Sequence, residues 1–248
     1  YLSKGKRYSK HNKKIISAII VTHVFGSASD MTKILKISKK YSVPVVEDCA
    51  EGLGSFFKDK HLGTFGNVGI LSFNGNKIIT SGSGGAIITN SKKKYLEALH
   101  LVSVSKIKHK WKFYHNKLGW NYRINSLSAA LGYSQLKKIN LLIKNKRLLH
   151  RKYKKKFDKN KNFHLVNLDD RINFKSNYWL NALYIRNRKI SKNKTLDYLN
   201  QKGLQCRPIW DLLHTLPHFK KFKAYDIKNS KKLFERIILL PSSSFLID

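Results

Sequence analysis

Four polar side chains fall at positions that suit one another's chemistry: Asp48, Glu51, Ser72 and Lys77. Asp48 ends a short apolar run, and Lys77 lies in a loop of small residues, Asn74–Gly85. An amine in a close-fitting, partly apolar loop stays nucleophilic and can attack an aldehyde. A carboxylate stabilises the proton on a neighbouring ring nitrogen, and a serine hydroxyl donates to a phosphate. Each of these side chains has a use if the site holds pyridoxal phosphate, which carries an aldehyde, a ring nitrogen and a phosphate.

The elements that would position these residues follow from the spacing of apolar residues. Lys14–Val21 is predicted to be a buried strand, Asp30 caps a predicted helix over Met31–Tyr41, and Val43–Val46 is a second strand that ends at Glu47 and Asp48. Strand, helix and strand with short connections are typical of a parallel sheet covered by helices. Ligands bind at the carboxyl ends of the strands in such sheets, and Asp48 lies at one of these ends.

The rest of the chain continues as an α/β protein and then changes character after Asp158. The predicted strands are Gly69–Phe73, Ala86–Thr89 and Tyr178–Ile185, and the predicted helices are Lys92–Leu101, Leu127–Phe157 with a break near Asn140, Lys192–Gln201 and Lys231–Ile238. We place a domain boundary in the long helical stretch. This gives a large domain over residues 1–136 and a small α+β domain over residues 137–248.

The charge of the chain is extreme, with 50 Lys and Arg against 14 Asp and Glu and a formal net charge of +36. Only nine of the basic residues are Arg, the lysines are spread along the whole chain, and Asn is abundant as well. Base recognition favours Arg, and nucleic-acid binding favours clustered charge. We therefore favour a solvated basic surface over a nucleic-acid-binding module, which stays open as an alternative.

Other function classes are excluded by composition. Hydrophobic residues make up 42% of the chain, enough for a core, but no apolar run reaches the ~18 residues that a membrane span requires. Cys49 and Cys206 are the only cysteines, which excludes a disulfide framework and a cysteine-rich zinc site. The first residues contain no signal peptide and no Met, so we expect a cytoplasmic protein that is cut at its N-terminal end. We also expect the protein to hold no metal.

Longer strings around these residues resemble a known family. Val45–Glu51 (VVEDCAE), Gly63–Gly66 (GTFG), Leu71–Lys77 (LSFNGNK), Gly119–Arg123 (GWNYR) and the segment from Arg207 to His214 are similar to the DegT/StrS-type pyridoxal-phosphate-dependent nucleotide-sugar aminotransferases. The resemblance covers almost the whole chain and is strongest to the branch that makes 4-amino sugars for legionaminic-acid-type nonulosonates. It implies a type I aminotransferase fold.

The resemblance also implies a role for each matching residue. Lys77 would be the Schiff-base lysine that carries the proton, Asp48 would contact the pyridine nitrogen, and Glu51 would lie against the ring. Ser72 would bind the cofactor phosphate, and Asn121 would reach the phosphate of the neighbouring subunit's cofactor in a homodimer. His115, Arg207 and His214 are candidates for contacts with the nucleotide sugar. The implied reaction moves an amino group from glutamate to a 4-keto-6-deoxy nucleotide sugar in polysaccharide or nonulosonate biosynthesis.

The chain departs from the family at its N-terminal end. Family members carry a further region there, with a phosphate-binding loop and an aromatic residue that stacks on the cofactor. The chain thus resembles the C-terminal part of such an enzyme, with an incomplete large domain. An inactive fragment or one half of a split aminotransferase is a second interpretation. A related sugar dehydratase is a third, but those relatives have His in place of the lysine, and Lys77 argues against it.

Overall fold

The computed structural model describes residues 2–3, 6–166 and 173–247, which form two compact units. The first unit comprises Tyr1–Ile143 together with Arg171–Trp179, and the second comprises Lys144–Asp170 and Leu180–Asp248. The domain boundary that we predict between residues 136 and 137 stays a prediction, because compact units are not the same as domains. The division into units differs from the predicted boundary in two respects. It falls within helix α4 (Ile139–Phe157), and the segment that ends at Trp179 belongs to the first unit again.

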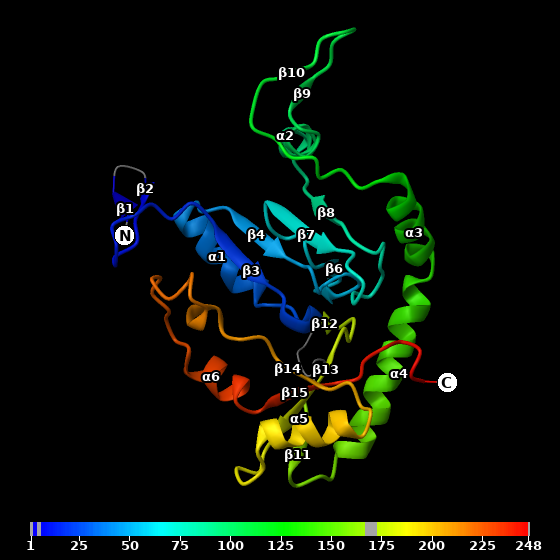
Figure 1. Cartoon of the computed structure of the whole chain (residues 1–248). Coiled ribbons are helices and arrows are strands. Elements are labelled where there is room, and N and C mark those ends of the chain that lie inside the picture. Colours follow the sequence, from blue (N-terminus) through cyan, green and yellow to red (C-terminus); the bar gives the residue numbers. More distant parts are fainter. Residues whose placement is uncertain (1, 4–5, 167–172, 248) are drawn as a thin grey trace. The chain divides into compact units, whose positions relative to one another are not determined.

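A four-stranded sheet forms the centre of the first unit, in the order β3-β4-β7-β8 (Figure 1). Its strands are β3 (Ile19–Thr22), β4 (Val45–Asp48), β7 (Val68–Ser72) and β8 (Gly85–Ile88). The pairs β3/β4 and β4/β7 are parallel, and β8 runs antiparallel to β7. The predicted α/β class with a mostly parallel sheet is confirmed.

Helix α1 (Met31–Tyr41) connects β3 to β4, as its apolar spacing predicts. The Asp30 carboxylate accepts the backbone N–H of Lys33 at 3.1 Å and so satisfies a donor at the helix start. Met31 is fully buried and packs with Val21 and Val45, while Ile34 and Leu35 cover the same cluster. Burial of this apolar face fixes the helix against the sheet.

The parallel strands end at one edge of the sheet, and this edge carries the predicted site. Thr22 pairs with Asp48, and Asp48 pairs with Ile70, so Ser72 lies two residues beyond that row on the same face. The chain then makes a loop over residues 73–84 before β8 returns. Two backbone hydrogen bonds of 3.0 Å close the loop, from Phe73 N–H to the Gly84 carbonyl and from Ser81 N–H to the Phe73 carbonyl.

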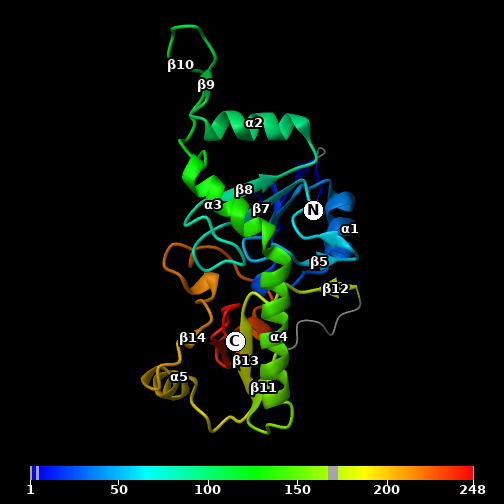
Figure 2. The ribbon, with the colours of Figure 1, turned by 90° about the vertical axis from the view of Figure 1, so that its right-hand side faces the viewer.

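Smaller elements complete the first unit. They are β1 (Leu2–Ser3) with β2 (Lys6–Arg7), the 3-10 turn η1 (Val24–Gly26), the small sheet β12 (Phe174–Lys175), β5 (Phe56–Phe57) and β6 (Lys60–His61), helix α2 (Lys92–Val102), the hairpin β9 (Lys106–Ile107) and β10 (Tyr114–His115), and helix α3 (Ser126–Lys137). Figure 2 shows the β9–β10 hairpin extending beyond α2. The predicted helix break near Asn140 falls at Lys138, between α3 and α4.

The second unit is an antiparallel sheet with helices, which matches the predicted α+β class. Its strands lie in the order β11 (Phe163–Leu165), β13 (Asn181–Ile185), β15 (Ile237–Leu240) and β14 (Arg207–Pro208), and its other elements are the C-terminal part of α4, α5 (Lys192–Gln201), η2 (Leu213–Thr215) and α6 (Lys228–Phe234). The core includes Leu183, Ile185, Leu196 and Ile238.

Three predicted boundaries are wrong. The predicted helix Lys231–Ile238 ends at Phe234, because the apolar run Ile237–Leu240 is a buried strand between β13 and β14. The predicted strand Tyr178–Ile185 starts only at Asn181, since Tyr178 has a left-handed φ of 52°. The predicted strand Lys14–Val21 starts at Ile19, and Ile15 before it is 50% exposed.

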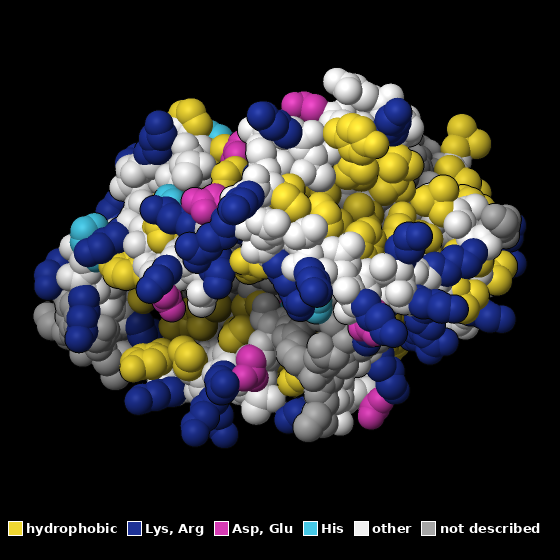
Figure 3. All heavy atoms as spheres, turned by 90° about the horizontal axis from the view of Figure 1, so that it is seen from below, with side chains coloured by type: hydrophobic (Ala, Val, Ile, Leu, Met, Phe, Trp, Pro, Cys, Tyr) yellow, Lys and Arg dark blue, Asp and Glu magenta, His cyan; other side chains and the backbone are white. Residues whose placement is uncertain are grey.

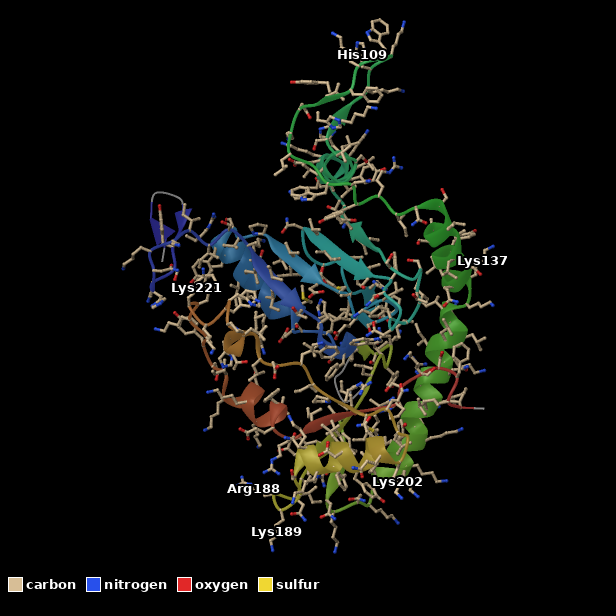
Figure 4. The ribbon with its side chains drawn as sticks, in the orientation of Figure 1. His109, Lys137, Arg188, Lys189, Lys202 and Lys221 are labelled. Atoms are coloured by element: carbon tan, nitrogen blue, oxygen red, sulfur yellow. The ribbon has the colours of Figure 1, made fainter. Side chains whose placement is uncertain are left out.

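No helix in the described ranges has the length and apolar character that crossing a membrane requires. On the face seen in Figure 3, Lys and Arg of the described residues are spread over most of the surface outside an apolar patch, rather than gathered in one stripe. The Lys and Arg residues labelled in Figure 4 come from α3 (Lys137), the position directly after α5 (Lys202) and separate loops (Arg188, Lys189 and Lys221). This scatter agrees with the interpretation of the charge as a solvated surface.

Candidate active site

Lys77 lies in the loop that follows β7, where its backbone N–H donates to the Asn74 carbonyl at 3.0 Å. Its side chain is half-buried, and its Nζ lies 4.2 Å from the centre of the Trp179 ring. Burial lowers the pKa of the Lys77 amine, while the nearby carboxylates of Glu51 and Asp48 oppose that shift. A lowered pKa increases the fraction of neutral amine, which is the nucleophilic form.

Glu51 lies in the turn after β4 and accepts the backbone N–H of Phe25 at 2.5 Å. Burial raises the pKa of the Glu51 carboxyl, and Asp48 adds to that rise, whereas the Phe25 N–H and Lys77 oppose it. Asp48 ends β4, where the Ala50 N–H donates to its carboxylate at 3.1 Å and the Thr22 hydroxyl lies at 3.5 Å. Lys77 thus interacts electrostatically with both acids. Asp48, Glu51 and Lys77 are brought together, as the sequence argument requires.

Ser72 ends β7 on the same sheet face as Asp48, and its Oγ accepts the Asn74 N–H at 3.4 Å. A hydroxyl that accepts in this way can still donate its own hydrogen to an anion. The adjoining loop leaves open space, since a Cβ added at Gly75 or Gly82 would meet no atom within 4 Å. The edge therefore offers an amine, two carboxylates and a hydroxyl.

The other predicted site residues belong to other elements. Asn121 and His115 are exposed in the first unit, where Asn121 bridges to Ser103 and His115 Nδ1 lies 2.7 Å from the Val104 carbonyl. Arg207 and His214 belong to the second unit. Arg207 is exposed in β14, and His214 in η2 lines an open groove of about 560 Å³. Their predicted contacts stay predictions, as do the roles given to Asp48, Glu51, Ser72 and Lys77.

Comparison with known proteins supplies the family. The model of the DegT/DnrJ/EryC1/StrS aminotransferase family matches residues 9–248. The chain belongs to this family. It is 33% identical over 98% of its length to EpsN of Bacillus subtilis, whose name describes a pyridoxal phosphate-dependent aminotransferase, and 33% identical over 91% of its length to GDP-perosamine synthase of Escherichia coli O157:H7. The predicted family is thereby confirmed.

Solved structures of aminotransferases show the same fold. The aminotransferase PseC of Helicobacter pylori, involved in the biosynthesis of pseudoaminic acid, superposes with a TM-score of 0.85 at 25% identity over 93% of this chain and 62% of PseC. The aminotransferase TlmJ of Streptoalloteichus hindustanus superposes with a TM-score of 0.86 at 21% identity, over 94% of this chain and 62% of TlmJ. This chain spans 63% of EpsN and 60% of the Escherichia coli synthase.

A buried carboxylate beside the site was not assigned a role by the sequence argument. Glu47 has no exposed surface, and it accepts the backbone N–H groups of Gly63 at 2.9 Å, Phe65 at 2.7 Å and Gly66 at 2.5 Å. Its Oε2 also lies 3.1 Å from His23 Nε2. In this family member the acid therefore holds the GTFG turn to the end of β4. Its place directly before Asp48 is the only sequence signal for that role.

His23, Glu47 and Cys49 group their ligand atoms within 4.8 Å, but their chemistry does not suit a metal ion. The Ser29 N–H donates to His23 Nδ1 at 3.1 Å, so Nε2 carries the hydrogen and donates to Glu47. Burial raises the pKa of the Cys49 thiol, and Glu47 and Asp48 raise it further. A metal would need a thiolate and an unprotonated imidazole nitrogen. Cys49 is a small, fully buried residue.

Proposed function

We propose that this chain is the lysine-bearing part of a pyridoxal-phosphate-dependent nucleotide-sugar aminotransferase. One observation carries the proposal: the half-buried Lys77 amine lies near the carboxylates of Glu51 and Asp48 at the carboxyl ends of β4 and β7. Membership in the aminotransferase family supports it. Because the chain spans less than two thirds of EpsN and the Escherichia coli synthase, the activity is proposed for the protein that contains this part.

The residues at this edge fit the cofactor by their chemistry. Lys77 offers an amine for the aldehyde, Asp48 a carboxylate for the ring nitrogen, and Ser72 a hydroxyl for the phosphate. Glu51, with its raised pKa, is suited to meet a polar ring substituent rather than a second positive charge. The open space around Gly75 and Gly82 leaves room for a planar ring beside the loop.

Each residue then has a defined task. When bound, pyridoxal phosphate supplies an aldehyde and an electron-withdrawing ring that stabilises negative charge on the adjacent carbon. Nζ of Lys77 takes a proton from Cα of the amino-acid donor and later releases it, acting as base and then as acid. Its lowered pKa increases the fraction of neutral amine that can take the proton. Asp48 keeps the ring nitrogen protonated, because a negative charge beside that nitrogen favours its cationic form.

For the substrate we propose a 4-keto-6-deoxy nucleotide sugar that receives its amino group from glutamate. Three relatives of this chain are GDP-perosamine synthases, and two from Campylobacter jejuni are named UDP-4-amino-4,6-dideoxy-N-acetyl-beta-L-altrosamine transaminases. These names support a 4-amino-sugar product. His115, Arg207 and His214 are the proposed contacts to the nucleotide sugar, because a guanidinium can bind a diphosphate through two hydrogen bonds and imidazoles bind hydroxyls.

We further propose a homodimer in which Asn121 contacts the partner's cofactor. The segment around Asn121 exposes large apolar side chains: Trp111 is 73% exposed, Phe113 84%, Leu118 81%, Tyr122 74% and Leu127 85%. Contiguous exposed apolar residues are typical of an interaction surface. The molar mass in solution, measured by light scattering, tests this proposal, and Leu127→Glu should shift a dimer toward monomer.

The experiment that tests the site uses the purified chain and equimolar pyridoxal phosphate. Borohydride reduction should fix the cofactor covalently on Lys77, which mass spectrometry of the digested protein would show. Lys77→Ala should abolish this label, whereas Lys36→Ala, on the exposed face of α1, should leave it unchanged. An inactive fragment that binds no cofactor would give scattered labelling of exposed lysines without enrichment at Lys77. That result refutes the proposal for this chain.

A further inference from the structure

We propose that Trp179 is a positioning residue for Lys77, carried into the first unit by residues 173–179. The inference rests on the proposed role of Lys77. It concerns a residue that neither the sequence motifs nor the assigned cofactor contacts include. The segment is far from both halves of the site in the chain, yet it contacts each of them.

The first step is the anchoring of the segment. Strand β12 pairs with β5 through Phe174 opposite Phe57, and Lys175 forms a 2.7 Å ion pair with Asp59. Asn177 is fully buried, and its amide donates to the carbonyls of Glu51 at 2.7 Å and Leu53 at 2.9 Å. A buried amide with both hydrogens bonded to one turn holds that turn firmly, because breaking the contact leaves polar atoms without water.

The second step links this anchor to the lysine loop. Trp179 is 1% exposed, and its backbone N–H donates to the Asn177 side-chain oxygen at 2.9 Å. Its indole N–H donates to the Asn76 carbonyl at 2.7 Å, one residue before Lys77. The same ring covers the Lys77 amine at 4.2 Å. One side chain therefore fixes the backbone next to Lys77 and covers one side of its Nζ.

The two functions of the ring can be separated by substitution. Burial is the main cause that lowers the pKa of Lys77, and the Trp179 ring lies over its amine, where the ring face also attracts the charged form. Trp179→Leu removes the aromatic cover and the N–H donor together. Trp179→Phe keeps an aromatic cover and removes only the donor, so it loosens the backbone at Asn76 with a smaller change in the surroundings of the amine.

The experiment measures Lys77 directly and needs no cofactor. The chain is labelled with trace acetic anhydride across a pH series, and the extent of Lys77 acetylation is compared with that of exposed Lys36 by mass spectrometry. In the wild type, Lys77 should become reactive at lower pH than Lys36. Trp179→Leu should shift the pH at which Lys77 becomes reactive, whereas Trp111→Leu, on an exposed tryptophan, should not.

The second variant keeps the inference testable if Trp179→Leu does not fold. In Trp179→Phe, hydrogen exchange of the peptide that contains Lys77 should speed up about fivefold, the factor for one lost hydrogen bond. The inference is overturned if Lys77 in folded Trp179→Leu becomes reactive at the same pH as in the wild type. It is also overturned if hydrogen exchange of this peptide is unchanged in Trp179→Phe. Failure of wild-type Lys77 to take the borohydride label would instead refute the proposed function, so the two failures are distinguishable.

Discussion

The buried acid Glu47 allows a sharp test of how the site is held. Its two carboxylate oxygens accept hydrogen bonds from four donors: Gly63 and His23 contact Oε2, and Phe65 and Gly66 contact Oε1. Glu47→Gln has nearly the same shape, but it replaces one oxygen by an NH₂ group. Whichever way the amide is turned, that NH₂ faces two donors instead of accepting from them.

The expected cost follows from this count. Leaving a buried polar group without its partner costs about 1–3 kcal/mol, so two lost hydrogen bonds should lower the free energy of unfolding by about 2–6 kcal/mol. The matched control is Glu97→Gln, because Glu97 is half-exposed and its ion pair with Lys117 is 3.6 Å long. An exposed pair contributes about 0–1 kcal/mol, so this variant should unfold almost like the wild type.

The assay is urea unfolding followed by tryptophan fluorescence, repeated across pH. Burial alone would raise the pKa of Glu47, but the hydrogen bonds from His23, Gly66 and Gly63 lower it below its usual value. A group with a lowered pKa stabilises the fold above its unfolded pKa and loses that effect as the pH falls through its folded pKa. The difference between wild type and Glu47→Gln should therefore be constant near neutral pH and shrink in acid. Equal unfolding of Glu47→Gln and Glu97→Gln at neutral pH would refute this reasoning.

Two further predictions concern other buried groups. Burial lowers the pKa of Lys146 from 10.5 to about 8. Between these two pH values the unfolded chain binds more protons than the folded chain, so the free energy of unfolding should rise by about 2 kcal/mol from roughly pH 7 to 9.5. Urea unfolding at both pH values checks this, and Lys146→Met should remove most of the rise. Cys49 and Cys206 are buried with raised thiol pKa values, so a thiol reagent should label both only in denaturant, and rapid labelling of the native chain would contradict their burial.

Local rules were sufficient for the sheet that carries the site. The β3–α1–β4 unit follows from an N-cap at Asp30 and from helical spacing that buries Met31. These signals lie within a few residues of one another, so the sequence displays them directly. The run Ile237–Leu240 was assigned wrongly, since an apolar run beside a helix is ambiguous until its strand partners are known. Its partners, β13 and β14, lie at least 28 residues away in the chain.

The same limit applies to the site. Asp48 and Lys77 could be found because each follows a strand and because their motifs resemble the family. Trp179 could not, since its bond to Asn76 spans 103 residues of sequence and the strand assigned over Tyr178–Ile185 gave it no special role. Asn177 contacts the Glu51 carbonyl across 126 residues, and nothing in its local sequence indicates that contact.

Lys77 and Lys146 together show why a lowered pKa does not by itself identify an active site. Both amines have lowered pKa values through burial, and the effect on Lys146 is large enough to bring its pKa to about 8. Lys146, however, is 7% exposed and donates to the Ser242 carbonyl at 2.6 Å within the second unit, so no substrate carbon can reach its nitrogen without disrupting that contact. Lys77 is half-buried beside two carboxylates and a glycine loop with open space. Reactivity requires a neutral amine that a ligand can also approach, and of these two lysines only Lys77 meets both conditions.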